Sequence, residues 1–164
     1  MDELLKLLRD DASLTPAQIG GRLNLPEAEV EAKIKEYESN GVILGYRAVI
    51  NEEKLKVELV RAVIEVKITP EREGGFDRLA TRIARFDEVH SCHLMSGGFD
   101  LLVIVEGSDL KGVSSFVSEK LATLQGVIST VTHFMLKPYK EQGVLMGGEF
   151  SDEKLAVSPQ AVLV

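Results

Sequence analysis

Four side chains that can bind a metal ion lie in the second half of the chain: His90, Cys92, His93 and His133. Imidazole nitrogen and thiolate sulfur are ligands that zinc prefers. Three of the four fall on one predicted strand, where successive side chains point to opposite faces. His90 and Cys92 are therefore expected to share a face, with His93 on the other. This set is too dispersed for a compact site, and we predict neither a metal nor a cofactor.

Signatures of catalysis are also missing from the sequence. Cys92 is the single cysteine, and no His–Asp arrangement accompanies it, so we interpret it as a small buried apolar residue. The chain contains no phosphate-binding glycine loop, no nucleophile elbow and no paired-carboxylate signature. We therefore predict that the protein is not an enzyme.

Composition narrows the class of protein further. The 164 residues are 45% hydrophobic, which permits a folded core, and carry a formal charge of −7. A single cysteine excludes an internal disulfide scaffold. No apolar run approaches the ~20 residues of a membrane helix, and the start of the chain is acidic where a signal peptide is basic. We expect a cytoplasmic protein with no membrane partner.

Three short helices are predicted in the first 40 residues. Leucines recur at helical spacing in residues 2–11. A second helix is expected to begin at Thr15-Pro16, because threonine caps helices and proline suits the first helical position. The third should run from Pro26 to Ser39, before the stop signal Asn40-Gly41. A tight break between the second and third helices is typical of a helix-turn-helix.

The apolar periodicity changes after residue 41. Residues 42–50 are expected to form a wing or a strand that leaves the helical unit, and residues 51–57, with four charged residues among seven, read as a linker. The predicted domains are a helix-turn-helix at 1–50, an effector-binding and oligomerisation domain at 58–140 and a C-terminal extension at 141–164.

The segment 58–140 has the predicted element order β-α-β-β-α-β. Alternation in 58–68 indicates a half-buried strand, with Val60, Ala62, Ile64, Val66 and Ile68 pointing one way and Arg61, Glu65 and Lys67 the other. The remaining elements are a helix at 76–84, strands at 88–95 and 99–106 joined by Ser96-Gly97-Gly98, a helix at 113–124 and a strand at 127–137. This order is the ferredoxin-like arrangement. The fold class is therefore α+β, with an N-terminal winged helix-turn-helix followed by a ferredoxin-like domain.

The third predicted strand is apolar on both faces. Leu101, Val103 and Val105 alternate with Leu102 and Ile104. Both helices of a ferredoxin-like domain cover the same face, so the other apolar face needs a partner, and we predict dimerisation. The alternative is that the C-terminal tail covers this face within one chain.

Two motifs within this element order resemble a known family. Asn40-Gly41-Val42-Ile43-Leu44-Gly45-Tyr46 resembles the Glu-Gly-Val-Ile-x-Gly-Tyr of the Lrp/AsnC (feast/famine) transcription regulators, and Gly97 to Asp100 resembles their Gly-x-x-Asp. The resemblance covers about residues 2–140. It implies a homodimer, or an assembly as large as an octamer, whose C-terminal domains bind a small effector, often an amino acid. It also implies that the N-terminal domains bind double-stranded DNA.

The resemblance places Gly97 and Asp100 in the effector site, near a protomer interface. Chemistry agrees, because glycine lets backbone N–H groups approach a carboxylate and an ionised aspartate can receive an α-ammonium group. Ser96 and Gly98 join the candidate site as neighbours in the same loop. The alternative is that the glycines only form a hairpin turn and that Asp100 is an ordinary turn residue.

Thr130 and Thr132 fall where family members carry a Thr-x-Thr element that adds hydroxyl groups to the same pocket from a neighbouring chain. A spacing of two puts both hydroxyls on one sheet face, together with Ile128 and Phe134. Threonine is also a common strand former, so a purely structural role remains equally open.

The helix that the resemblance assigns to DNA reading is acidic. Residues 26–40 carry Lys33 and Lys35 against five glutamates, a net charge of −3, and residues 1–50 also sum to −3. Carboxylates at a helix N-terminus favour the helix dipole but repel phosphate. DNA binding would then depend on Arg22, Lys33, Lys35 and Arg47, with Arg9 as a further candidate. Lys33 occupies the matched arginine position, where lysine cannot make a bidentate guanine contact.

Two interpretations remain. We favour a ligand-responsive transcription regulator whose weak intrinsic DNA affinity is raised by multivalent binding of an oligomer. The second is a relative that has lost operator binding and acts as a small-molecule sensor or as an enzyme resembling the siroheme decarboxylases. That enzyme would need cations for an anionic tetrapyrrole, and Arg61, His93 and His133 form no clear basic cluster.

The tail resembles that of some family members, which end in Leu-x-Val-Ser-Pro. Alternation in Leu155, Val157 and residues 162–164 predicts an added edge strand or a strand exchanged with a partner.

Overall fold

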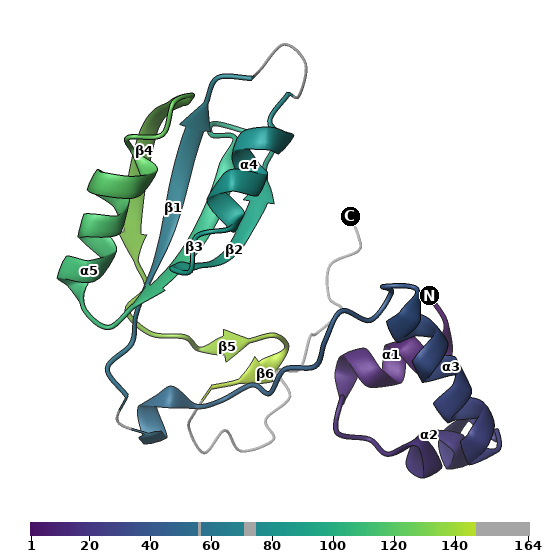
Figure 1. Cartoon of the computed structure of the whole chain (residues 1–164). Helices are drawn as coiled ribbons and strands as arrows, with labels where there is room; N and C mark the ends of the chain where they lie inside the picture. Colours follow the sequence, from purple (N-terminus) through teal and green to yellow (C-terminus); the bar gives the residue numbers. More distant parts are fainter. Residues whose placement is uncertain (56, 71–74, 147–164) are drawn as a thin grey trace, which may run out of the picture. The chain divides into compact units, whose positions relative to one another are not determined.

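In a computed structural model, the chain forms two compact units, Met1–Ile50 and Asn51–Val164 (Figure 1). The structure describes residues 1–55, 57–70 and 75–146. Among these residues, no helix is both long enough and apolar enough to cross a membrane.

The first unit contains α1 (Glu3–Asp10), α2 (Pro16–Leu23) and α3 (Glu27–Ser39), as the apolar spacing predicts. Asp2 caps α1 by accepting a hydrogen bond from the Leu4 backbone N–H at 3.0 Å. Thr15 and Gln18 form a reciprocal capping box at the start of α2. The start of α3 has no side-chain cap, and its first-turn glutamates complement the helix dipole instead.

The turn between α2 and α3 depends on a close backbone approach. The Leu25 N–H donates to the Gly20 carbonyl at 3.0 Å, and a Cβ atom at Gly20 would lie only 2.6 Å from the Leu25 carbonyl oxygen. Asn24 ends α2 in the left-handed conformation, at φ 55°. Below this turn lies a small core built from all three helices: Leu4, Leu8, Ile19 and Val30.

The segment after α3 differs from the prediction. Residues 42–50 contain no strand, so the strand expected there is not formed. Gly41, at φ +67°, ends the helix, and the N–H groups of Val42 and Ile43 then donate to the Tyr37 carbonyl at 2.8 and 3.1 Å. These hydrogen bonds join the start of the segment to α3, and Ile43 packs against the core of the unit.

The second unit is built on a four-stranded antiparallel sheet of order β2-β3-β1-β4. Its strands are β1 (Val60–Ile68), β2 (Val89–Leu94), β3 (Leu101–Gly107) and β4 (Val127–Phe134). The order confirms the ferredoxin-like prediction. The last strand ends at Phe134, before the expected residue 137.

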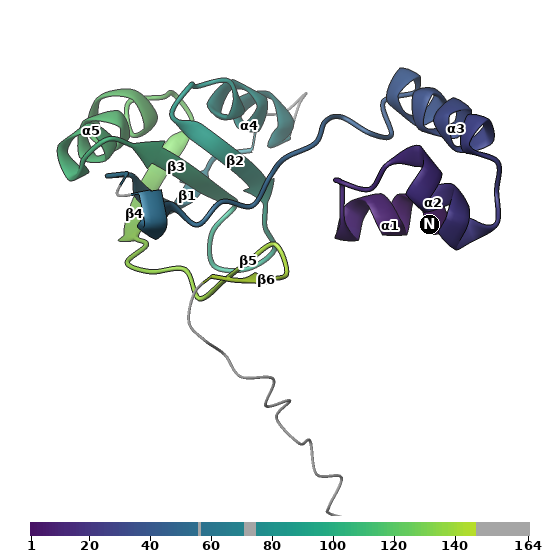
Figure 2. The ribbon, with the colours of Figure 1, turned by 90° about the horizontal axis from the view of Figure 1, so that it is seen from below.

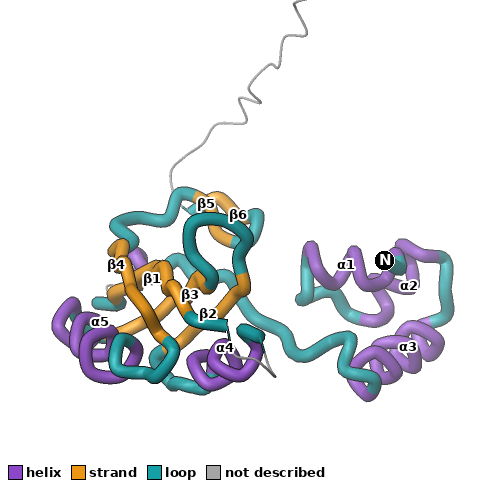
Figure 3. Tube along the Cα trace, turned by 90° about the horizontal axis from the view of Figure 1, so that it is seen from above, coloured by secondary structure: helices purple, strands orange, loops and turns teal. Residues whose placement is uncertain are grey.

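Both helices of this unit lie on one side of the sheet (Figures 2 and 3). They are α4 (Asp77–Ala84) and α5 (Leu110–Ser115), and the latter continues directly into the π-helix η2 (Phe116–Leu121). Alternate residues of β1 and β3 point under these helices and are almost fully buried. The central core residues are Ile64, Val66, Leu79, Ile83, Leu101, Val103, Val105, Val113, Phe116 and Leu121.

The opposite side of the sheet, here called the open face, carries the other set of alternate residues. Val63, Leu102 and Ile104 are half-buried there, and Val131 is exposed. The register supports this placement, because Val63 lies opposite Ile104 and Val131 lies opposite Glu65. The prediction that β3 is apolar on both faces is confirmed.

Short elements flank the sheet in the sequence. The predicted linker contains a 3-10 turn, η1 (Glu52–Leu55). After β4, a hairpin of β5 (Lys140–Glu141) and β6 (Val144–Leu145) turns at Gln142 and Gly143, both at positive φ, and lies on the side of the sheet away from the helices (Figures 2 and 3). The strand expected in residues 155–164 lies outside the described residues.

Candidate functional site

The predicted Gly-x-x-Asp residues lie in the loop between β2 and β3. Asp100 connects this loop to the end of β1 through two hydrogen bonds. The Asp100 N–H donates to the Val66 carbonyl at 3.1 Å, and its carboxylate Oδ2 accepts from the Ile68 N–H at 2.8 Å. The Met95 N–H closes the loop on the Asp100 carbonyl at 2.8 Å. A carboxylate accepts about four hydrogen bonds, so the bond from Ile68 leaves acceptor capacity for a ligand.

The other predicted members of this loop are open to solvent. Ser96, Gly97 and Gly98 are exposed, and a Cβ atom at either glycine would meet nothing within 4 Å. Gly97 has φ +146°, a conformation that favours glycine. The loop therefore combines an anchored carboxylate with accessible backbone.

Thr130 and Thr132 lie on β4, on the other side of β1 from this loop. They pair with Val66 and Ile64, so both threonines share the face that the helices cover, and both are half-buried. Since the Val66 carbonyl also accepts from Asp100, Thr130 and Asp100 flank the same end of β1.

One part of the threonine prediction is wrong. Phe134 pairs with Ala62 and shares the face of the threonines, as expected. Ile128 does not continue this alternation, because a β-bulge at Lys67/Ile68 leaves it without a partner in the register, and it is 62% exposed.

The four potential metal ligands are separated further than the sequence predicts. A register shift between Val89 and Ser91 breaks the alternation of β2, so His90 and Cys92 do not share a face. His90 lies near Glu106 on the open face, whereas Cys92 packs against the core under α4. Burial raises the pKa of the Cys92 thiol. Across the described residues, no three His, Cys, Asp or Glu side chains gather closely enough to hold a metal ion.

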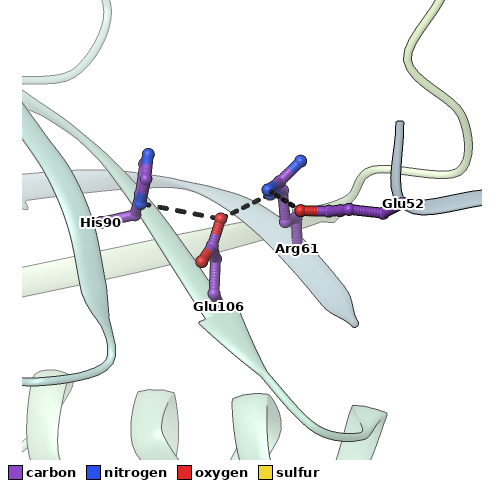
Figure 4. Close-up of polar contacts among 4 residues, drawn as sticks. All are labelled: Glu52, Arg61, His90 and Glu106. Atoms are coloured by element: carbon purple, nitrogen blue, oxygen red, sulfur yellow. Dashed lines mark hydrogen bonds and ion pairs between the residues drawn. The ribbon is translucent and has the colours of Figure 1, made fainter. Parts of the chain in front are cut away.

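Arg61 is the centre of a charged cluster at the edge of the open face (Figure 4). Its Nε lies 2.5 Å from Glu106 Oε1 and its Nη2 lies 2.7 Å from Glu52 Oε1. His90 Nδ1 lies 3.6 Å from the same Glu106 oxygen. Partial desolvation disfavours the charged guanidinium, but the two carboxylates outweigh it and hold the pKa of Arg61 above its ordinary value.

These pairings bear on the tetrapyrrole hypothesis. Arg61 is engaged by two carboxylates, and His133 Nε2 lies 3.2 Å from Glu65 Oε1. The positive charge that an anionic macrocycle would need is therefore already neutralised at Arg61. His93 is exposed on β2, opposite Leu102.

Glu52 was not among the predicted site residues, although it pairs with Arg61 from the predicted linker. It also lines a pocket of about 150 Å³ between η1 and the segment after β4. No local pattern in the sequence indicates this contact, because β5 and β6 and the segment before them meet η1 only in the folded unit. The pocket is lined by Asn51, Glu52, Glu53, Val57, Leu59, Arg61, Met135, Leu136, Pro138 and Met146.

The predicted DNA-binding cations come from α2, from α3 and from the segment after α3. Lys33 is half-buried, and its Nζ lies 3.4 Å from Glu29 Oε1 on the same helix. Lys35 is two residues along α3 and exposed, and side chains at this spacing do not face each other. Arg22 on α2 and Arg47 after α3 are also exposed, and the further candidate Arg9 lies 3.7 Å from Asp10.

Two side-chain hydrogen bonds involve residues in the C-terminal half of α3. Tyr37 Oη donates to Asp2 Oδ2 at 2.5 Å, which lowers the pKa of Asp2 and raises that of Tyr37. Tyr46 Oη donates to Glu38 Oε1 at 3.1 Å. The exposed acids Glu27, Glu29 and Glu31 remain at the N-terminal half of the helix.

Comparisons with known proteins match both units. Residues 3–43 match a winged helix-turn-helix DNA-binding domain, and residues 61–145 match the Lrp/AsnC ligand binding domain. The HTH-type transcriptional regulator YugG of Bacillus subtilis is 42% identical over 158 residues, covering 96% of this chain and 95% of that protein. The proline dehydrogenase transcriptional activator of Rhizobium radiobacter is 32% identical, covering 87% of this chain and 90% of that protein.

A solved structure shares the architecture. A transcriptional regulator of Neisseria meningitidis, crystallised as a complex with L-Met, has a TM-score of 0.66 and 26% sequence identity. The match covers 88% of this chain and 96% of that one. The relatives named here are transcription regulators. With both domain matches in the expected order, the chain belongs to the Lrp/AsnC family of ligand-responsive transcription regulators.

Proposed function

We propose that the β2–β3 loop binds a free α-amino acid and that this binding regulates how the helix-turn-helix unit contacts operator DNA. The observation that carries the proposal is the position of Asp100. Its carboxylate is held against the end of β1 by the Ile68 N–H at 2.8 Å, beside the exposed backbone of Gly97 and Gly98.

This arrangement suits both charged ends of an amino acid. The α-ammonium pairs with the free acceptor positions of Asp100, and the α-carboxylate accepts hydrogen bonds from the backbone N–H groups of Gly97 and Gly98. The hydroxyl of Ser96 is exposed in the same loop. Thr130 and Thr132 add hydroxyls from β4, in this chain or a neighbouring copy. The relative crystallised with L-Met supports this ligand class.

DNA binding is assigned to Arg22, Lys33, Lys35 and Arg47. The net charge of −3 in residues 26–40 means that one copy attracts phosphate weakly. A dimer or larger assembly compensates, because the second helix-turn-helix unit binds at a high effective concentration once the first is bound.

The assembly forms through the open face of the sheet. Leu102, Ile104 and Val131 present an apolar surface there that the two helices do not cover. A twofold axis through this surface buries the same patch on both copies, as in most homodimers.

Thermal unfolding with a panel of L-amino acids tests the effector assignment. An effector that binds only the folded protein raises Tm in proportion to ln(1 + [L]/Kd). The amide of the best ligand, which lacks the carboxylate, and its desamino analogue, which lacks the ammonium, should produce no shift. The proposal fails if no amino acid raises Tm, or if the desamino analogue works equally well.

Two charge variants on α3 test the DNA assignment. Glu29→Gln removes a carboxylate and releases Lys33 from its pair, so DNA from upstream of the gene should bind more tightly. Lys33→Gln should weaken the same binding. Retardation is measured at ~50 mM salt, where phosphate contacts are strongest. The absence of any retardation by the unmodified protein at that salt would contradict DNA binding, and an unchanged affinity in both variants would contradict the role of α3.

A further inference from the structure

All three histidines of the chain lie on the open face of the sheet. His133 pairs with Val63 and His93 pairs with Leu102, and both of these partners point to the open face. His90 reaches the same face from the bulge of β2. All three imidazoles are exposed in a single copy. Because β2 and β4 are the two edge strands, the histidines border the central apolar residues from both sides.

The strand register puts two of these histidines beside the apolar residues of the proposed dimer contact. Two rows of paired residues cross the four strands on the open face: Val131, Glu65, Leu102 and His93 in one, and His133, Val63, Ile104 and Ser91 in the other. Directly opposed side chains on neighbouring strands have Cβ atoms about 5 Å apart. A second copy that covers Leu102 and Ile104 therefore covers His93 and His133 as well.

The fixed charges of the open face balance one another. The four strands place two cations and two carboxylates there: Arg61, Lys67, Glu65 and Glu106. Beside them, Glu52 of η1 pairs with Arg61, and the β5–β6 hairpin carries one charge of each sign, Lys140 and Glu141. With neutral imidazoles, the strand residues sum to zero, so two copies of this face meet without net repulsion. This balance suits a second copy of the chain as the occupant.

We propose that the open face is a pH-dependent dimer contact, which holds when its histidines are neutral and separates when they are protonated. The inference rests on the proposed dimer and adds its regulation. Histidine is the side chain that gains charge as the pH falls from about 8 to about 5. Three added protons take the strand residues of one face from zero to +3, so two apposed faces together carry +6.

The carboxylates on the face do not cancel this charge. Glu65 lies 3.2 Å from His133 and can balance it. Glu106 is shared between Arg61 and His90 (Figure 4). Among the residues that the structure describes, no carboxylate pairs with His93, whose neighbour across the strand pair is Leu102. Burial of an unpaired imidazolium is unfavourable, so a free copy accepts a proton at His93 that the dimer excludes.

Sedimentation equilibrium of the full chain at several concentrations, between about pH 8 and pH 5.5, tests the proposal, because glutamate and aspartate remain ionised over this range. The dimer Kd should rise as the pH falls. If His93 alone is protonated on dissociation, each dimer takes up two protons, and log Kd rises by up to about 2 per pH unit.

Substitutions at His93 test whether this residue carries the effect. His93→Gln removes the titration and should remove most of the rise in Kd. His93→Lys supplies a permanent charge and should raise Kd at about pH 8 to the level of the unmodified chain in acid. Thr81→Lys is the matched control, since it adds the same charge at an exposed position of α4, on the helical side of the sheet, and should leave Kd unchanged. Circular dichroism at each pH confirms that every variant is folded.

The outcomes distinguish this inference from the proposed dimer. A Kd that is independent of pH, or that falls in acid, would overturn the inference while the dimer stands. It is equally overturned if His93→Gln retains the full pH dependence, or if His93→Lys and Thr81→Lys raise Kd by the same amount. An unmodified chain that stays monomeric at about pH 8 would overturn both the inference and the dimer.

Discussion

At the residue scale, single residues determine the conformation of the β2–β3 loop and of the turn between α2 and α3. Asp100 uses one carboxylate oxygen to hold the β2–β3 loop on β1, so its structural and ligand-binding roles overlap. Gly20 and Gly21 are neighbours on α2 with opposite surroundings. Two substitutions at Asp100 can separate loop anchoring from ligand binding, and alanine at each glycine can separate a steric clash from a gain in helix propensity.

Substitutions at Asp100 should separate loop anchoring from ligand binding. Asp100→Ala removes the acceptor for the Ile68 N–H and should cost about 1–2 kcal/mol of unfolding free energy, together with the amino-acid-induced rise in Tm. Asp100→Asn retains an acceptor oxygen but lacks the charge, so it should remain close to the unmodified stability while losing the rise. Both are measured by denaturant unfolding and thermal shift. A full ligand response in Asp100→Asn would show that the carboxylate charge does not bind the effector.

Alanine at the two glycines of α2 should have opposite effects. A Cβ atom at Gly20 would lie 2.6 Å from the Leu25 carbonyl oxygen, and because that atom is backbone, Gly20→Ala should destabilise the first unit by about 1–3 kcal/mol. Gly21 has nothing within 4 Å, so Gly21→Ala should stabilise α2 by about 0.5–1 kcal/mol. Thermal unfolding followed by circular dichroism measures both, and equal effects would contradict the close approach in the turn.

At the element scale, the helices and strands follow from apolar periodicity, but the irregularities do not. Alternation in 58–68 correctly predicts β1, and the capping signal at Thr15-Pro16 correctly predicts the start of α2. The bulges in β2 and in the β1–β4 pair each shift one residue out of alternation, which is why His90 and Ile128 were assigned wrongly. A bulge depends on pairing between strands, and no pattern within one strand encodes it.

The candidate site shows the same division. Gly97 and Asp100 were recognisable from a local motif, and the structure places them in the loop joining two strands, as expected. The contacts of Arg61 with Glu52 and Glu106 join residues 9 and 45 positions away in the chain. The first contact depends on η1 lying beside β1, and the second depends on the pairing of β1 with β3. Neither arrangement can be seen in a local stretch of sequence.

Acid should weaken the attachment of η2 to the start of β2. A hydrogen bond from Lys120 holds the pKa of Glu88 below its ordinary value of 4.5. At pH values above the ordinary pKa of 4.5, this ion pair therefore stabilises the fold. Its contribution is lost as the pH falls through the lowered pKa of Glu88. Lys120→Met should cost less than about 1 kcal/mol at pH 7, because the pair is partly exposed, and the difference should vanish at low pH.

Acid unfolding followed by circular dichroism from about pH 6 to pH 2 measures this difference. Lys111→Met is the matched control, since Lys111 is an exposed lysine on α5 for which the described residues supply no acidic partner. A stability difference that persists unchanged below the pKa of Glu88 would contradict the role of the carboxylate.

At the scale of the whole molecule, the proposed assembly depends on the apolar residues of the open face. Ile104→Ser exchanges a half-buried apolar side chain on this face for a polar one, and a twofold dimer loses the contact twice. Since a buried aliphatic side chain contributes about 1.5–3 kcal/mol and the contact is lost twice, the dimer Kd should rise by at least about 100-fold. Sedimentation should then detect a species near the 18.0 kDa of one chain at concentrations where the unmodified protein has twice that mass.

Leu110→Ser is the control for this loss, because Leu110 is 57% exposed at the start of α5, on the helical side of the sheet. Circular dichroism confirms that both variants remain folded before their masses are compared. A dimer that survives Ile104→Ser but dissociates with Leu110→Ser would place the interface on the helical side. It would also leave the apolar residues of the open face without a partner, and DNA affinity at low protein concentration would then be insensitive to Ile104.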